Sequence, residues 1–506
     1  MPGRLHAALA DPASTLFGRA CILLTCTGVT FLYAMTVTVA NVSLPQMQGS
    51  LSATQDQIAW VVTLNIVATA IATPMSAWLV SRLGRRRLMI YCVIGFALAS
   101  LACGLATSLE TLVLYRVLQG ACGAPLVPVS QAIVQDTNPK SSHGIVLAFF
   151  GVGSVLGPIV GPVLGGYLSE LYNWRWVFFM ILPFTALALV AVMVFLHDSE
   201  RPSPTRLDWT GLLTLAVTVT CVQLLLDRGE RRDWFESGEI VAYGAIAAIA
   251  FYLFVTHSLT ARNPFLNPGL LRDRNFSIGL VIVFVFGMLN FTPMTLIPPL
   301  LQSVGGYPDS IIGFILGARG SGTLLAFLSM IYISRFDPRK LIACGFLLQA
   351  AAGWSMAQLD VNLSTWDVFW PVFIQGFGVG MLWVPITMVT FSTLSPRHTT
   401  EGTAVYHLLR NLGSSIHISV SIALVIRMTQ VNYAEIAPAV SPLNELISLP
   451  WVLGRFDIDS TRGLAALSGE VSRQARMIGY INSFYFFSMT ALLVLPLIFL
   501  IKRART

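Results

Sequence analysis

The chain of 506 residues is 55% hydrophobic and 11% charged, with a formal net charge of +7 and a mean hydropathy of +0.72. A soluble protein of this length needs far more polar surface than this composition supplies. The composition therefore excludes a soluble globular enzyme and predicts an all-α polytopic membrane protein.

Apolar stretches long enough to cross a bilayer recur along the whole chain when a window of about 19 residues is moved over it. They predict about fourteen transmembrane helices, at residues 20–45, 57–80, 88–107, 110–135, 144–169, 175–197, 207–226, 239–258, 276–301, 310–333, 341–358, 369–392, 405–427 and 480–501. The pair within 207–258 is separated by a charged stretch from Asp227 to Glu239. It is the weakest part of this pattern.

Lysine and arginine concentrate in alternate loops. About 19 of the 31 fall on the side that holds the N-terminus, against roughly nine on the other side. This bias predicts that both termini lie in the cytoplasm, and it explains the positive net charge without a nucleic-acid partner. The first 18 or so residues do not have the pattern of a cleavable signal peptide.

Catalytic and metal-binding motifs are absent from the sequence. The seven cysteines lie in or beside apolar stretches without paired spacing, so we expect neither a disulfide framework nor a metal site. No phosphate-binding P-loop, His-x-x-x-His pair or Gly-x-Ser-x-Gly elbow occurs. We therefore expect no cofactor and no enzymatic activity, and any transport must be driven by a gradient or by a partner.

Two pairs of motifs repeat at nearly the same offset. Residues 81–88 recur at 334–341, and Gln119-Gly120 recurs as Gln375-Gly376, a spacing of about 253 to 257 residues. The repeats predict two parallel six-helix bundles with a cavity between them, an arrangement suited to alternating access. We divide the chain into segments: a cytoplasmic N-terminus (1–19), a first bundle (20–200), two inserted linker helices (201–262) and a second bundle (263–506) with a long periplasmic loop at about 428–479.

One apolar stretch combines glycine and proline in a pattern that a soluble core helix would rarely tolerate. Glycine allows two helix backbones to approach, and proline removes a backbone hydrogen bond, so we expect a bent helix packed closely on another. Packing related to function and generic helix packing both remain open. The residues are Gly157, Pro158, Gly161, Pro162, Gly165 and Gly166.

Together with this run, residues 77–86, the Arg116-Val-Leu-Gln119-Gly120 segment and residues 173–176 resemble the major facilitator superfamily. Within it, the chain is similar to the fourteen-span drug:proton antiporters, and to bacterial multidrug-efflux permeases of the Emr type. The resemblance covers essentially the whole chain. It implies the major facilitator fold, antibiotic efflux in exchange for protons, and a periplasmic membrane-fusion adaptor with an outer-membrane channel as partners.

The resemblance also implies a cytoplasmic gate in the loop between the second and third spans. Its residues are Arg82, Gly84, Arg85 and Arg86. A plain positive anchor on the cytoplasmic side is the alternative. The chain has Ser81 where the family usually has an acid, so a charge relay through that position is in doubt.

Charged side chains in the spans are candidates for a substrate or proton pathway. Arg116, Arg319 and Arg410 lie in apolar helices, where a cation needs a cavity or a partner. The family links Arg116 to proton or substrate handling, and an arginine bonded to backbone carbonyls is the alternative. His407 and His417 share a helix face with Arg410 within about 80° and could carry protons, or could be satisfied structural groups.

The first span lacks an acid that many relatives carry about five residues before Asn41, because Thr36 occupies that position. Proton coupling through a buried carboxylate is therefore not supported, although Asp208 or Asp227 could serve if water reaches them. The remaining polar and aromatic candidates for the pathway are Tyr33, Gln119, Gln375, Trp383 and Tyr406.

Together with the resemblance, these features predict an inner-membrane secondary active exporter of small amphipathic compounds, driven by proton antiport through rocker-switch alternating access. Three buried arginines without matching acids favour anionic or neutral substrates. An uncoupled or dedicated exporter of a metabolite, such as a siderophore or organic acid, and a membrane subunit that transports nothing are the alternatives. In the predicted periplasmic loop, residues 463–480 could form an amphipathic helix that docks an adaptor, or a self-packed loop.

Overall fold

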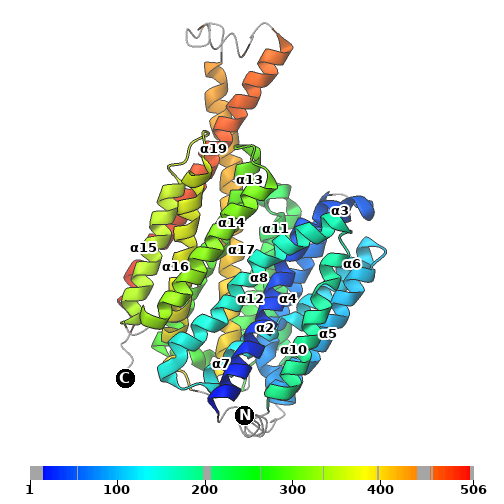
Figure 1. Ribbon diagram of the computed structural model, residues 1–506, viewed down its shortest axis with the longest axis vertical. Helices are drawn as coiled ribbons and strands as arrows, with labels where there is room; N and C mark the ends of the chain where they lie inside the picture. The colour runs from blue at the N-terminus through cyan, green and yellow to red at the C-terminus, as the bar shows by residue number, and fades with distance from the viewer. Residues whose placement is uncertain are drawn as a thin grey trace.

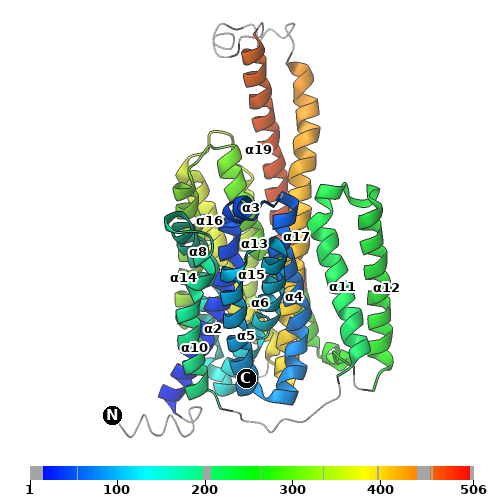
Figure 2. The ribbon, with the colours of Figure 1, turned by 90° about the vertical axis from the view of Figure 1, so that its right-hand side faces the viewer.

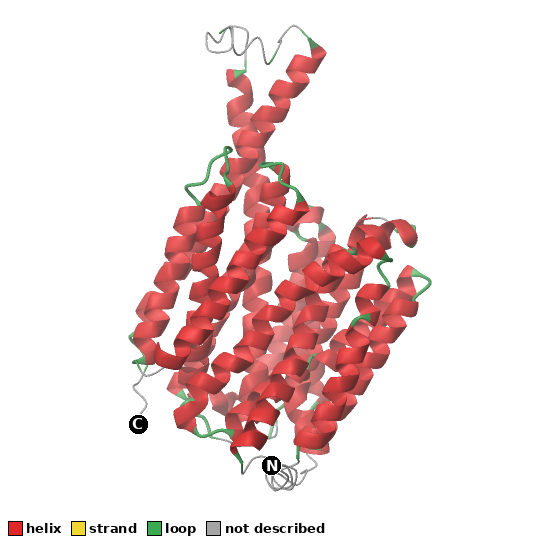
Figure 3. Cartoon of the chain, viewed as in Figure 1, coloured by secondary structure: helices red, strands yellow, loops and turns green. Residues whose placement is uncertain are grey.

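The computed structural model describes residues 15–53, 55–197, 207–262, 264–333, 336–395, 398–440, 449, 456 and 460–501, and over these residues the chain is helical, without strands (Figure 3). The helices are α2 (Leu16–Val42), α3 (Leu44–Ser50), α4 (Gln55–Leu83), α5 (Arg85–Leu105), α6 (Leu109–Gly123), α7 (Leu126–Thr137), α8 (His143–Leu171), α9 (Trp176–Phe179), α10 (Ile181–Phe195), α11 (Trp209–Arg228), α12 (Gly238–Thr260), α13 (Arg274–Ser303), α14 (Asp309–Ile333), α15 (Pro338–Met356), α16 (Thr365–Phe391), α17 (Thr399–Ile436), α19 (Thr461–Leu493) and α20 (Leu495–Ile498).

Among these residues, thirteen helical segments are long and apolar enough to cross a membrane. The remaining predicted span, 341–358, corresponds to α15, which lies beside the others in the bundle (Figure 1). Its composition is less apolar because Arg339 and Lys340 stand in its first turn and Gln349 lies in its middle. The predicted all-α membrane fold is thus confirmed. The fourth span is made of α6 and α7 in succession, with Pro125 between them.

Two bundles with the same internal packing follow one another along the chain. In the first, α2 packs on α8, α4 on α6, and α5 on α6 and α10. In the second, α13 packs on α17, α14 on α16, and α15 on α16 and α19. A side chain at Gly120 would collide with the backbone oxygen of Asn65, and one at Gly376 with that of Arg319. The repeated Gln-Gly motif therefore serves the same close helix contact in both halves.

The α2–α8 contact explains the glycines of the Gly-Pro run. Every fourth residue of α8 from Gly153 to Gly165 faces α2, and a Cβ atom at Gly157 would lie 2.7 Å from the carbonyl oxygen of Phe31. The carbonyl of Pro158 also accepts a hydrogen bond from the Thr38 hydroxyl at 3.4 Å. The side chain of Pro162 lies outside the described residues. The glycine stripe thus holds two helices of the same bundle together.

The inserted helices stand on one side of the bundles, with α12 outermost (Figure 2). Helix α11 packs on α4 of the first bundle and on α17 of the second. Leu215 and Val219 of α11 form a small apolar cluster with Leu408 of α17. Near the other end of α11, the Thr63 hydroxyl donates to Asp227 at 2.7 Å. The pair is therefore attached at the seam between the two halves.

A partly buried carboxylate fixes the entry to α11. Asp208 accepts backbone hydrogen bonds from Gly211 and Phe265, each at 3.0 Å, and pairs with His257 at 2.8 Å. Burial opposes ionisation of this carboxyl group, but the hydrogen bonds from Gly211, His257 and Phe265 outweigh it and lower its pKa. Asp208 is thus an ionised structural group that joins α11, α12 and the segment after α12.

Helices α17 and α19 project beyond the bundles at the end opposite the two chain termini (Figures 1 and 2). The structure differs here from the predicted loop at about 428–479, because 428–436 and 461–479 are helical. Most of the residues between α17 and α19 lie outside the described part of the chain. The expected amphipathic helix at 463–480 is present in α19, with Leu467, Val471 and Ala475 buried and Leu464 exposed.

The apolar cores differ between the two ends of the molecule. Near the end that carries the termini, Leu147 and Ala148 of α8 belong to one core together with residues of the second bundle, such as Met330. Toward the opposite end, one core consists of residues of the second bundle and another of residues of the first. At the terminal end, α8 thus joins the core of the second bundle, while the first bundle also keeps a core of its own, and at the other end the cores of the two bundles are separate.

Candidate functional site

Arg116 is buried inside the first bundle, on α6, with 1% of its surface exposed. Its Nε donates to the carbonyl of Val61 at 3.2 Å, and one terminal nitrogen donates to Gln119 Oε1 at 2.6 Å. Gln119 in turn donates to the Ser100 hydroxyl at 2.7 Å. The guanidinium group lies 5.8 Å from the ring centre of Phe178. A backbone carbonyl and a neutral amide thus hold this cation, without an acid.

Arg319 forms a similar network inside the second bundle. Its Nε donates to Gln375 Oε1 at 2.9 Å, and one terminal nitrogen donates to both oxygens of Asn290, at 2.7 and 2.8 Å. The amide of Gln349 donates to the Gln375 carbonyl at 2.9 Å. In both halves the glutamine of the repeated Gln-Gly motif accepts from a buried arginine. The arginine comes from the same helix in the first half and from the neighbouring helix in the second.

The junction between the bundles contains a buried hydrogen bond. His407 of α17 and Gln131 of α7 meet at 2.7 Å between Nε2 and Oε1, and their side chains are 2% and 0% exposed. This contact joins the two halves near the end that carries the termini. Sequence reasoning selected His407 and missed Gln131, although a glutamine inside an apolar span was a signal that could have found it.

Next to this pair, Arg410 and two aromatic residues line the same junction. The guanidinium carbon of Arg410 lies 5.0 Å from the ring centre of Trp383, and one of its nitrogens donates to Asn411 Oδ1 at 3.2 Å. The rings of Trp383 and His407 are 6.1 Å apart, and those of Tyr406 and His407 are 5.5 Å apart. Trp383, Tyr406, His407 and Arg410 therefore form one cluster.

The other histidine of the predicted face lies elsewhere. His417 Nδ1 contacts the Thr292 hydroxyl at 2.8 Å, and its ring stacks on Phe486 at 4.7 Å. Both partners belong to the second bundle. The expected common face of His407 and His417 is not formed, because the helix turns His417 toward α13 and α19 and His407 toward α7.

Candidates from the first span lie inside the first bundle. The Tyr33 hydroxyl donates to the Thr69 hydroxyl at 3.3 Å, and its ring lies 6.3 Å from that of Phe96. Thr36 bonds only to the carbonyl of Leu32 in its own helix, at 2.8 Å. Asn41 belongs to α2, but its side chain is outside the described residues. The described contacts of Tyr33 and Thr36 are thus all made within the first bundle.

The arginine-rich loop between α4 and α5 turns at Gly84, whose φ of +82° favours glycine. Arg85 pairs with Asp136 at the end of α7 at 2.6 Å, and Arg86 donates to the carbonyl of Met193 near the end of α10 at 2.8 Å. Arg82 lies over the Trp78 ring at 5.5 Å. The loop therefore joins helix ends within the first bundle by contacts to an acid and to a terminal carbonyl.

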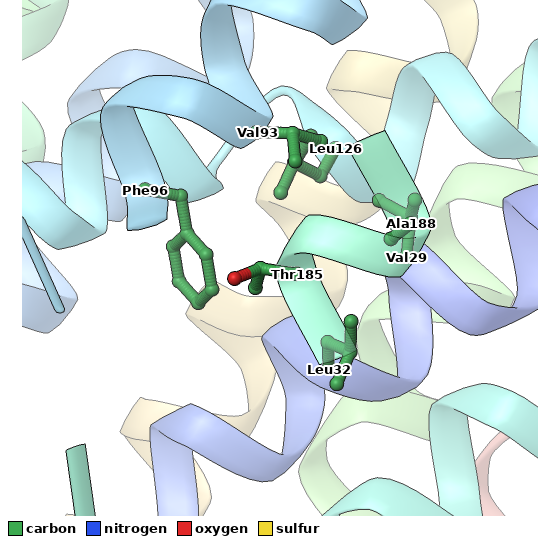
Figure 4. Close-up of a pocket in the computed structure, with 7 residues that line it drawn as sticks. All are labelled: Val29, Leu32, Val93, Phe96, Leu126, Thr185 and Ala188. Carbon is green, nitrogen blue, oxygen red and sulfur yellow. The ribbon is translucent and has the colours of Figure 1, made fainter. Parts of the chain in front are cut away.

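A small pocket opens inside the first bundle (Figure 4). Its lining is apolar apart from Thr185, whose hydroxyl donates to the carbonyl of Leu182 at 2.8 Å. The pocket contains none of the predicted pathway residues. Its lining residues are Val29, Leu32, Val93, Phe96, Leu126, Thr185 and Ala188.

Acidic groups are not part of the junction core. None of the Asp or Glu side chains in the described segments is among the fully buried residues, whereas Arg116, Arg319 and His407 are. Nor do the described His, Cys, Asp and Glu residues form a group that could hold a metal ion. The chemistry available at the junction is hydrogen bonding and positive charge.

An all-helical membrane protein made of two similar bundles, with polar side chains buried at their junction, has the architecture of a membrane transporter. Residues 26–417 match the sequence profile of the Major Facilitator Superfamily. The chain is 33% identical to the multidrug export protein EmrB of Escherichia coli over 82% of each chain, and 31% identical to EmrB of Haemophilus influenzae over 96% of each chain. This chain belongs to the Major Facilitator Superfamily, whose members are transporters and not enzymes.

A further relative is the fatty acid resistance protein FarB of Neisseria gonorrhoeae, which is 30% identical over 93% of this chain and 94% of its own. Among solved structures, the human organic anion transporter TETRAN superposes with a TM-score of 0.62 at 14% identity, over 95% of this chain and 99% of its own. The proton:xylose symporter XylE superposes with a TM-score of 0.61 at 12% identity, over 94% of each chain. These two structures support the fold, and the resemblance to Emr-type permeases is confirmed by sequence.

Proposed function

We propose that this protein is an inner-membrane exporter of small amphipathic compounds that exchanges its substrate for protons by alternating access. The names of the relatives, multidrug export proteins and a fatty acid resistance protein, support export as the activity. Leu147 and Ala148 of α8 lie in the core of the second bundle, and His407 bonds to Gln131 at the same end, whereas the cores at the other end are separate; these contacts support a state closed at the terminal end. Rocking the two bundles about their junction would reverse this closure.

The observation that carries the proton-coupling proposal is the buried His407–Gln131 hydrogen bond between the bundles. A histidine can gain or lose a proton at cellular pH, and no buried carboxylate competes for this role among the described residues. A proton on His407 would add a charge beside Arg410, where no acid balances it. Protonation would therefore destabilise the closed junction, and deprotonation would favour it, which links proton transfer to the rocking motion.

Charge at the junction also bears on the substrate. Arg116 and Arg319 bond within separate bundles, whereas Arg410 lies over the Trp383 ring, beside the junction residue His407. One unbalanced cation next to an aromatic ring favours anionic or neutral amphipathic compounds over cations. We assign Tyr33, Trp383, Tyr406, His407 and Arg410 to the substrate and proton pathway, and Arg116 and Arg319 to its support.

Orientation and partners complete the proposal. We place the end with the termini in the cytoplasm, where the Arg85–Asp136 pair would stabilise the closed gate. The projecting ends of α17 and α19 would then lie in the periplasm and would present a helical surface to a membrane-fusion adaptor and its outer-membrane channel. The two bundles and the inserted pair α11–α12 would form the three structural units of the transporter.

An uncoupled or dedicated exporter is the second candidate. Thr36, which bonds to a carbonyl of its own helix, stands where many relatives have an acid, and this favours a pathway without proton exchange. Under this alternative, His407 would be a structural group that fixes the junction.

Transport by purified protein in liposomes with an acidic lumen tests the proposal. We expect accumulation of an anionic or neutral amphiphile above its equilibrium level, which disappears when an ionophore collapses the pH gradient. His407→Gln should abolish accumulation, whereas His257→Gln, which changes a histidine outside the junction, should not. Flux that equilibrates without regard to the pH gradient would support the uncoupled exporter, and the absence of flux for every amphiphile would refute both.

A further inference from the structure

Several buried polar groups at the junction have no partner within the described part of the chain. They are the indole N–H of Trp383, the amide nitrogen of Gln131, the Nε of Arg410 and the Nδ1 of His407. The side chains of Trp383, Gln131 and His407 are at most 3% exposed. A buried donor without an acceptor costs about 1–3 kcal/mol. Trp383, Gln131 and Arg410 supply three such donors in one cluster, which indicates a ligand that supplies acceptors, whereas the Nδ1 of a neutral His407 is an acceptor because its Nε2–H donates to Gln131.

The groups belong to a compact cluster. The Arg410 guanidinium carbon is 5.0 Å from the centre of the Trp383 ring, and the His407 ring is 6.1 Å from it. The His407 ring in turn contacts Gln131 through the 2.7 Å hydrogen bond. The cluster thus extends over two helices of the second bundle, α16 and α17, and reaches α7 of the first.

The chemistry of these groups limits the ligand. An indole N–H and a guanidinium group only donate hydrogen bonds, and the free nitrogen of Gln131 also donates. Arg410 forms no ion pair among the described residues, so its charge is not neutralised there. A ligand group that fits must accept several hydrogen bonds and carry negative charge. A carboxylate has two oxygens with about four acceptor sites and one negative charge.

We propose that Gln131, Trp383 and Arg410 form a binding subsite for the carboxylate headgroup of an amphipathic substrate. This inference rests on the proposed export function and adds the site and the headgroup to it. The carboxylate neutralises Arg410 and accepts hydrogen bonds from Trp383 and Gln131. Since Gln131 and the other two residues belong to different bundles, a bound headgroup contacts both halves and occupies the surface that closes.

Equilibrium binding to the full-length protein in detergent tests this subsite. The probes are dodecanoate, dodecanol and dodecyltrimethylammonium, which share one alkyl chain and differ in the headgroup. We expect dodecanoate to bind at least about tenfold more tightly than either other probe. Trp383→Phe keeps the ring and removes the donor, and Gln131→Leu removes the amide, so each should weaken dodecanoate binding about tenfold and leave dodecanol binding unchanged.

Trp174→Phe is the matched control. Trp174 is also buried with an unpartnered indole N–H, but it lies in the core of the first bundle. We expect this variant to bind dodecanoate like the wild type. Equal binding of dodecanoate by wild type, Trp383→Phe and Gln131→Leu, or equal binding of the three probes, would overturn the subsite. Transport of amphiphiles would then still support the proposed exporter, whereas binding of no probe and transport of no amphiphile would refute both.

Discussion

Replacing Gly157 by alanine should separate α8 from α2 and destabilise the first bundle. The new Cβ would lie 2.7 Å from the Phe31 carbonyl oxygen and 2.8 Å from the Met35 nitrogen, both of which are backbone atoms that cannot rotate away. Restoring an ordinary contact of 3.4 Å requires the helices to move apart by roughly 0.7 Å. A gap of this size removes about a quarter to a half of each dispersion contact, and overpacking of this kind costs about 1–3 kcal/mol.

Unfolding in mixed micelles, followed by tryptophan fluorescence, measures this cost. Gly28→Ala in α2 is the matched control, because a Cβ atom at Gly28 would meet nothing within 4 Å. Alanine is favoured over glycine in a helix by about 0.5–1 kcal/mol, so we expect Gly28→Ala to raise the free energy of unfolding and Gly157→Ala to lower it. Equal stabilisation by both substitutions would refute the close α2–α8 contact as the reason for the glycine run.

Three further predictions concern charged groups. Asp208→Asn should lower the free energy of unfolding by about 1–3 kcal/mol at neutral pH. Because the pKa of Asp208 is lowered in the fold, its ionised form stabilises the protein above about pH 4. The difference in free energy of unfolding between wild type and Asp208→Asn should therefore shrink as the pH falls below that value, which unfolding measured at several pH values would show. Arg85→Ala should cost less than about 1 kcal/mol in the same assay, since its pair with Asp136 is partly exposed; a larger loss would contradict this reading. Arg116→Lys should reduce transport and stability together, because an ammonium group cannot reproduce the fork of bonds to Gln119 and a backbone carbonyl, and unchanged behaviour would argue against that role.

The sequence predicted the architecture well because membrane spans have a strong signal. Length and apolar composition located the helices, and the repeated Gln-Gly motif predicted two halves whose corresponding helices pack alike. The region from 428 to 479 was harder to predict. Polar residues suggested a loop, but α17 and α19 continue as helices beyond the apolar spans, with Leu467 and Val471 buried.

Predictions about single side chains depended on contacts that the sequence does not encode locally. On an ideal helix, His407 and His417 point in directions that differ by only about 80°. In the structure, however, His407 meets α7, whereas His417 meets α13 and α19, so the two rings have different partners. Arg116, Arg319 and Arg410 were similar in sequence, but two of them bond within a bundle and the third lies at the junction. Gln131 was missed because its importance comes from a residue 276 positions away.

Substrate-induced proton movement tests the account of transport most directly. Purified protein is reconstituted in liposomes that contain a pH-sensitive dye, and an amphiphile is added without an imposed pH gradient. We predict a change of lumenal pH with wild type and with His257→Gln, and none with His407→Gln. Substrate flux without any pH change in the wild type, or a pH change that persists in His407→Gln, would contradict the proposed role of the junction histidine.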